Sequence, residues 1–121
     1  MEYIDDLSLC YETLSRWLKP GGHMSHQIDF KCEGIAKQWN GHWAYSDLLW
    51  KIRRGRRTYT INREPHSVHV QLLEKYGFNV VTDVKYELPS EIPREYLVER
   101  YKALSDEDLT TAGAFILSIK K

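Results

Sequence analysis

His26 and Asp29, near the end of one short segment, are of types that carry out acid–base chemistry. The segment HMSHQIDF, residues 23–30, alternates its side chains between two sides, which predicts a β-strand with one better covered face. Ligands of open α/β sheets bind at the carboxyl ends of strands, and an imidazole titrates near neutral pH. His26 could therefore accept a proton there. A histidine hydrogen-bonded within the sheet and an aspartate in a turn explain the pattern equally well.

A second group of candidate residues follows this strand. It combines an aromatic wall with an amide and a guanidinium, and it consists of His42, Trp43, Tyr45, Asn62 and Arg63. Such a set suits a polar or anionic small substrate. Local packing and capping are the alternative explanation.

Two further patterns carry weaker signals. His66 and His69 stand three residues apart on a predicted helix, whereas His23 and His26 point to opposite faces of a strand. No third ligand accompanies either pair, so we expect no metal site. The segment KIRRGRR, residues 51–57, could hold phosphate. Its place at the end of a helix and the zero net charge of the chain favour solvated cations, so we expect no nucleic-acid partner.

The elements that must position these residues alternate between helix and strand. The first half is predicted to contain a helix over 3–18, a strand over 23–30, a short helix capped by Ser46 and closed by Gly55, and an extended or irregular segment over 58–62. The second half is predicted to contain a helix capped by Ser67 and ended by Gly77, a strand over 78–88, a helix over 93–103, a helical turn from Ser105 and a strand over 112–119. The last strand is apolar on both faces and should be central. Long helical connections favour an open α/β sheet with helices on its faces.

The bulk composition is that of an ordinary globular chain. Its 121 residues suit one domain, residues 1–121, and hydrophobic residues make up 42 %. Cys10 and Cys32 are not in a paired motif, which predicts two reduced thiols. No apolar run approaches the roughly 20 residues of a membrane span. We therefore expect a cytoplasmic protein with no membrane partner.

Several segments together resemble one enzyme family. The segment MEYIDDLSLCYETLSRWLKPGG resembles the stretch after the fourth strand of class I, Rossmann-like, S-adenosylmethionine-dependent methyltransferases. HMSHQIDF resembles strand five, YGFNVV the start of strand six, and LSDEDLTTAGAFILSIKK the close of the domain. The motifs of a bacterial subgroup follow in order, namely HQID, HWAYSDLLW, INRE and YGFNVV. The resemblance implies a partial sheet of strands five, six and seven, in which the last strand is antiparallel and central.

The resemblance also assigns roles to residues. It implies that Glu2 and Tyr3 border the methionine end of the cofactor, and that His26 and Asp29 lie at the catalytic end of the strand. It implies that the pocket of a small-molecule acceptor is shaped by the segment that contains His42, Trp43, Tyr45, Asn62 and Arg63. Tyr3 stands where many relatives have histidine. Acidic residues that simply favour a helix N-terminus are the alternative explanation for Glu2.

One large departure limits the resemblance. The sequence has no GxGxG-like turn, which would let the backbone approach the cofactor closely, and no acid after a second strand, which would hold the ribose. We therefore expect the C-terminal, acceptor-side half of a methyltransferase, as a fragment, a split reading frame or a remnant, that does not bind S-adenosylmethionine tightly alone. Its expected partner is a missing N-terminal half or a second copy, joined near residues 4–30. The alternative is a non-enzymatic binding or interaction module that retains half of the fold.

Overall fold

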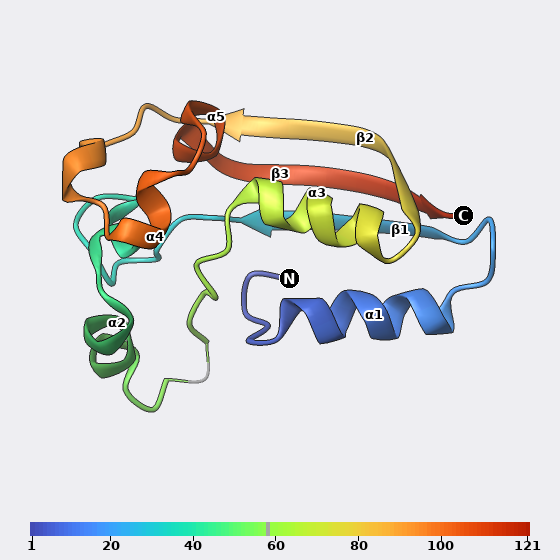
Figure 1. The fold of residues 1–121 in the computed structure, drawn as a ribbon, viewed down its shortest axis with the longest axis horizontal. Helices are drawn as coiled ribbons and strands as arrows, with labels where there is room; N and C mark the ends of the chain where they lie inside the picture. The colour runs from blue at the N-terminus through green and yellow to red at the C-terminus, as the bar shows by residue number, and fades with distance from the viewer. Residues whose placement is uncertain (58) are drawn as a thin grey trace.

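The computed structural model describes residues 1–57 and 59–121. Thr58, the first residue of the segment predicted as extended or irregular, lies outside the described residues. The elements in chain order are α1 (Leu7–Trp17), β1 (His23–Asp29), η1 (Gly41–Ala44), α2 (Asp47–Arg54), α3 (His66–Lys75), β2 (Phe78–Glu87), η2 (Arg94–Tyr96), α4 (Glu99–Lys102), α5 (Asp106–Thr110) and β3 (Thr111–Lys120). Figure 1 shows the long elements side by side, with the short helices gathered beyond one end of the sheet.

The sheet has three strands in the order β1-β3-β2, and β3 is antiparallel to both neighbours. Its pairing with β1 runs without interruption from His23 opposite Ile119 to Asp29 opposite Gly113. The pairing with β2 shifts register twice, between Val80 and Thr82 and again next to Glu87. The predicted central, antiparallel position of the last strand is confirmed.

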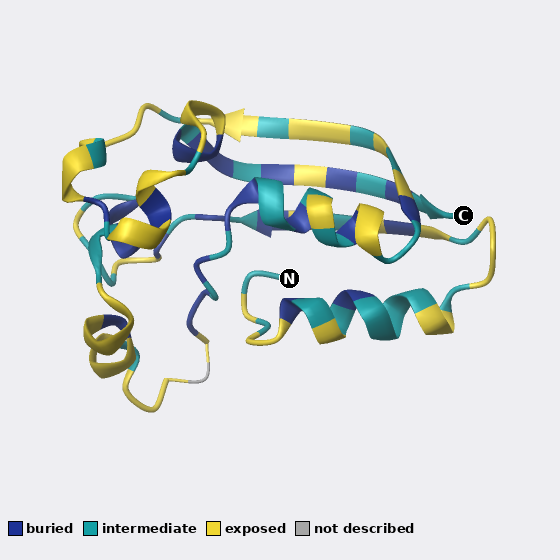
Figure 2. Ribbon diagram, in the orientation of Figure 1, coloured by how far each residue is buried: buried dark blue, intermediate teal, exposed yellow. Residues whose placement is uncertain are grey.

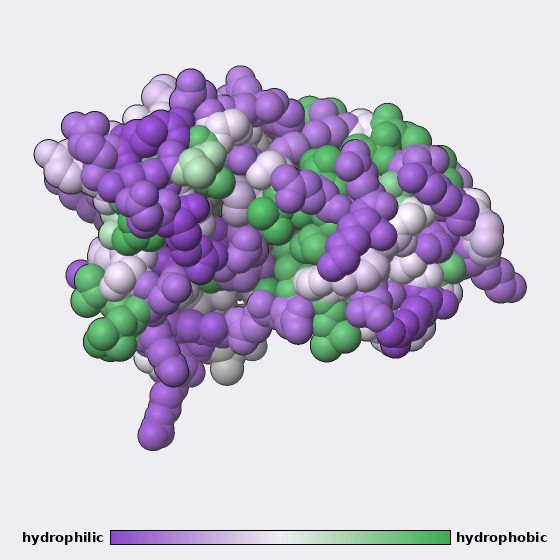
Figure 3. Space-filling view, in the orientation of Figure 1, coloured by the Kyte–Doolittle hydropathy of each residue, from purple (hydrophilic) through white to green (hydrophobic). Residues whose placement is uncertain are grey.

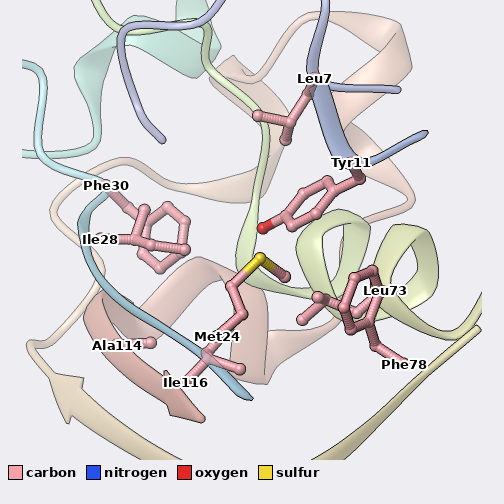
Figure 4. Packing of buried hydrophobic residues seen from close by; sticks show 9 residues of the cluster. All are labelled: Leu7, Tyr11, Met24, Ile28, Phe30, Leu73, Phe78, Ala114 and Ile116. Carbon is pink, nitrogen blue, oxygen red and sulfur yellow. The ribbon is translucent and has the colours of Figure 1, made fainter. Parts of the chain in front are cut away.

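The main core lies between one face of the sheet and the helices α1 and α3. Tyr11 from α1 and Leu73 from α3 are fully buried there, and Figure 4 shows both side chains directed toward the strands. The apolar positions of β1 alternate as predicted, with Met24 and Ile28 buried. The cluster comprises Leu7, Tyr11, Met24, Ile28, Phe30, Leu73, Phe78, Ala114 and Ile116.

The opposite face of the sheet is open. Val84 and Tyr86 of β2 are each 59 % exposed, and Phe115 of β3 is 41 % exposed. Figure 2 shows much of β2 coloured as exposed, in contrast to the mostly covered β3. A sheet with helices on both faces would bury these positions, so the prediction of helical cover holds for one face only.

A second structural unit, the helical extension, consists of residues 31–57, 59–65 and 88–110. It has two small apolar clusters of its own, one around Trp43 and one around Trp50. Trp43 is fully buried. The Val98 amide donates to the Trp43 carbonyl at 3.1 Å, which ties the two sequence-distant parts of the extension together.

Three predicted helix boundaries were wrong. The first helix begins at Leu7 rather than at residue 3, because the Asp6 side chain accepts the Leu9 amide as its N-cap. Ser67 does not cap α3, because the helix already begins at His66. Instead, the backbone amide of Ser67 donates a hydrogen bond of 2.9 Å to the carboxylate of the distant Asp108. The helix predicted over 93–103 is split into η2 and α4 at the buried Leu97.

Candidate functional site

A groove of about 440 Å³ opens on the exposed face of the sheet, at the carboxyl end of β1. The end of β1, the carboxyl-terminal part of β2 and the start of β3 form its floor. Side chains of both charges surround an apolar centre, and they include Glu2, Asp29, Lys31, Lys85, Tyr86 and Phe115. Concave sites that combine apolar walls with a few polar groups are typical of small-molecule binding.

Gly113 keeps the floor of this groove open. It lies opposite Asp29 on one side and opposite Tyr86 on the other. A Cβ atom at this position would lie 3.1 Å from the Ile28 carbonyl oxygen and 4.0 Å from the Tyr86 Cβ. Any larger side chain would therefore occupy the space between the two strand ends.

The charges around the groove are fixed by short-range partners. Asp29 accepts the Lys31 amide at 2.9 Å and forms an ion pair with the Lys31 ammonium at 3.4 Å. Lys85 donates to Glu107, and that hydrogen bond raises the pKa of Lys85. The Glu2 carboxylate lies 3.1 Å from the Met1 ammonium. The groove thus offers both carboxylates and ammonium groups to a polar molecule, but no free imidazole.

His26 lies on the other face of β1, toward the core. Its ring packs edge-on against Tyr11 at 6.3 Å, and its Nε2 is buried with no hydrogen-bond partner in the described part of the chain. Burial and, secondly, the Met1 ammonium lower the pKa of His26, so the ring is neutral at pH 7. The structure therefore does not bring His26 and Asp29 into one site.

Beside His26 lies a polar cluster that includes His66 and His69, the pair noted in the sequence as spaced three apart on a helix. The Tyr11 hydroxyl is 3.0 Å from Nδ1 of His69, and burial lowers the pKa of His69 to about 3. Nε2 of His66 lies 2.9 Å from the Asp83 carboxylate. Besides the spacing of the two histidines, a tyrosine on the apolar stripe of a helix was the available sequence signal. The described residues contain no group of three or more His, Cys, Asp or Glu that could hold a metal ion.

Arg63 organises the interior of the helical extension. The guanidinium is 4 % exposed, donates to the Tyr45 carbonyl at 2.7 Å and to the His42 carbonyl at 3.2 Å, and forms an ion pair with Asp47. The Arg63 carbonyl in turn accepts from the Trp43 indole at 2.9 Å. The guanidinium has its donors directed at backbone and carboxylate groups of the extension.

The remaining residues of the predicted acceptor pocket also make local contacts. His42 is buried against Trp43, and burial, followed by the Arg63 charge, lowers its pKa to about 3. Tyr45 stacks on the Trp50 ring. The Asn62 amide donates to the Met1 and Ile4 carbonyls at 3.1 Å and 2.8 Å, and so holds the N-terminal segment. The lining of the groove includes none of the five predicted residues.

Glu2 and Tyr3, the two predicted cofactor residues, are neighbours in the N-terminal segment but contact different parts of the protein. The Tyr3 hydroxyl donates to Glu33 at 2.5 Å, and this hydrogen bond raises the pKa of Tyr3 to about 12. Glu2 lines the groove together with Asp29. Of all the predicted site residues, the structure therefore brings together only Glu2 and Asp29 in the groove.

Comparison of the chain with known protein families, with curated proteins and with solved structures found no match. Among the described residues, every helix is too short or too polar to cross a lipid bilayer.

Proposed function

We propose that this chain is the acceptor-side half of a class I S-adenosylmethionine-dependent methyltransferase that acts on a small polar molecule. The observation that carries the proposal is the strand order β1-β3-β2 with an antiparallel strand β3 in the centre. This is the order that the sequence resemblance implies for strands five, seven and six. The packing of α1 and α3 on the same face of the sheet is consistent with it.

The groove supports the acceptor side of this proposal. It lies at the carboxyl end of β1, where open α/β sheets bind their ligands. Methyl transfer by in-line displacement depends mainly on positioning, and a groove with opposite charges at its rim can orient a polar acceptor. Glu2 and Asp29 are the two acidic groups that could accept hydrogen bonds from it.

Two observations support the expectation that this chain does not hold the cofactor tightly by itself. Tyr3 is engaged with Glu33, and Glu2 with the Met1 ammonium. The sequence has no glycine-rich turn between a strand and a helix, which is the feature that lets a backbone approach such a cofactor closely. We therefore assign cofactor binding to a complementary half.

Two adjoining surfaces could receive that half. The outer edge of β1 has no neighbouring strand among the described residues, and its register lacks the bulges that protect the edge of β2. An apolar groove of about 360 Å³ runs along α1, where Leu9 is 55 % and Trp17 is 77 % exposed. Exposed apolar patches of this kind usually mark interfaces.

We predict that the chain alone does not bind S-adenosylmethionine at roughly 100 µM, because it lacks the turn and the ribose acceptor. Calorimetric titration of the purified chain measures this, with the thermal unfolding midpoint as a second readout. A dissociation constant near 1 µM, about −8 kcal/mol, would show that the chain forms a cofactor site without a second half and would contradict the proposal.

A non-enzymatic interaction module is the second candidate function. It is favoured by the burial of His42, Trp43 and Arg63, whose side chains hold the extension together rather than line the groove. Both candidates predict weak cofactor binding by the isolated chain. They differ in whether a complementary half with the glycine-rich turn is encoded.

A further inference from the structure

The short helix α2 presents a row of aliphatic side chains to solvent. Leu48 is 69 % exposed, Leu49 is 51 % exposed and Ile52 is 66 % exposed. They lie along one side of the helix because Ile52 is four positions after Leu48 and three positions after Leu49. Figure 3 shows apolar atoms gathered at the lower left, where Figure 1 places α2 at the margin of the molecule.

The opposite face of α2 is anchored. Trp50 is 7 % exposed and packs with Cys32 and Ile61, while the Arg63 guanidinium lies 5.1 Å from its ring centre. Because Trp50 holds the helix in a fixed orientation, the aliphatic face is a rigid surface. With Trp50 packed in the interior, the three aliphatic side chains are directed toward solvent.

Basic residues surround the aliphatic face. Lys51 and Arg53 lie on α2 itself, and Arg56 and Arg57 follow Gly55 directly, all of them exposed. The stretch 51–57 contains five basic residues and no acidic one. One of the five, Arg54, pairs with Asp5 of the N-terminal segment at 2.7 Å. The other four cations flank the apolar row, and among them the Arg53 guanidinium lies 5.5 Å from the centre of the Tyr45 ring.

We propose that α2 and the residues up to Arg57 bind the surface of an anionic lipid bilayer. An interfacial helix places its apolar face at the boundary between headgroups and acyl chains, while Lys and Arg side chains reach anionic headgroups. The three aliphatic side chains and the four cations match those two requirements. The binding is peripheral, and it differs from the expectation of no membrane partner, which rested on the lack of an apolar run long enough to span a bilayer.

Other occupants fit these observations less well. A second copy placed across a two-fold axis would bring the same cations together, which opposes association. Nucleic acid would neutralise the cations but would leave Leu48, Leu49 and Ile52 in water, since phosphate contacts need no aliphatic row. A bilayer accommodates both kinds of side chain at once.

The test is flotation of the full chain with lipid vesicles at low salt. One set of vesicles is phosphatidylcholine alone, and the other contains about 30 % phosphatidylserine. We expect binding to the anionic vesicles only, and release at about 0.5 M salt, where charges are screened. Equal binding to both vesicles, or binding to neither, would overturn the proposal.

Variants separate the two contributions. Arg56→Gln/Arg57→Gln should lower partitioning roughly 30-fold, at about fivefold for each cation removed. Leu48→Ser/Leu49→Ser/Ile52→Ser should lower it by about a hundredfold or more, because three aliphatic side chains lose their apolar medium. Leu9→Ser is the matched control, an exposed leucine on α1 whose replacement should leave partitioning unchanged.

All the replaced side chains are exposed, so the variants should retain the unfolding midpoint of the parent chain.

Binding of a duplex oligonucleotide tests the alternative that the surface recognises nucleic acid. If the oligonucleotide binds more tightly than the anionic vesicles, and the aliphatic triple variant binds it unchanged, the surface is a nucleic-acid site and the membrane proposal is wrong.

Discussion

Replacement of Arg63 by alanine is expected to lower the free energy of unfolding by about 2–4 kcal/mol, because backbone acceptors lose their donor while the exposed Asp47 carboxylate stays solvated. The guanidinium is buried, and it holds the carbonyls of His42 and Tyr45 and the carboxylate of Asp47 at once. Its removal leaves two buried carbonyl acceptors without their donor. Alanine is preferred to glycine because Arg63 has a φ of +67°, and glycine would relieve that backbone strain. Urea unfolding followed by tryptophan fluorescence measures the change.

Arg100→Ala is the matched control for this experiment. Arg100 pairs with the same Asp47 carboxylate at 3.2 Å, but its side chain is 46 % exposed. Surface ion pairs contribute about 0–1 kcal/mol, so this variant should unfold nearly as the parent does. If Arg63→Ala also cost less than about 1 kcal/mol, the guanidinium would not be a structural residue, and the predicted role in substrate binding would regain its support.

Acidification should destabilise the chain by about 4 kcal/mol between pH 7.5 and pH 5. His42 and His69 are buried as neutral rings, and burial lowers the pKa of each from 6.5 to about 3. Below pH 6.5 the unfolded chain therefore binds two protons that the folded chain does not bind. The contribution of the two neutral rings to the free energy of unfolding is fully present above pH 6.5 and is lost as the pH falls toward 3. Each histidine contributes about 2 kcal/mol of the loss at pH 5.

Urea unfolding at a series of pH values measures this slope. His69→Gln should be less stable than the parent at pH 7.5, yet its loss on acidification should be smaller by about 2 kcal/mol. His23 is exposed, so His23→Gln should leave the curve unchanged. A parent chain that loses less than about 1 kcal/mol over this range would show that the two rings are accessible to protons in the folded state.

The parts of the fold that local patterns determine were predictable. The alternation of residues 23–30 identified the buried face of β1, and the doubly apolar segment 112–119 identified the central strand. Gly77 ends α3 with a φ of +82°, which only glycine adopts readily. These signals lie within a few neighbouring residues, where periodicity and turn chemistry act.

The parts that depend on distant contacts were not predictable. Ser67 and Asp108 are 41 positions apart, and no local pattern reveals that the second caps the helix of the first. In the same way, the residue types of His42 and Arg63 are those of a substrate pocket, and only their burial shows what they contact. The separation of His26 from Asp29 was in principle readable, because positions three apart on a strand point to opposite faces.

We propose that this chain is one half of a methyltransferase fold. The sequence of the DNA immediately upstream of the segment that encodes the chain, read in all frames, decides between this proposal and the interaction module. We expect a second half there, with a strand, a GxGxG-like turn, a helix and an acidic residue after the next strand. If the upstream region encodes no such half in any frame, the proposal is wrong and the interaction module is the better description.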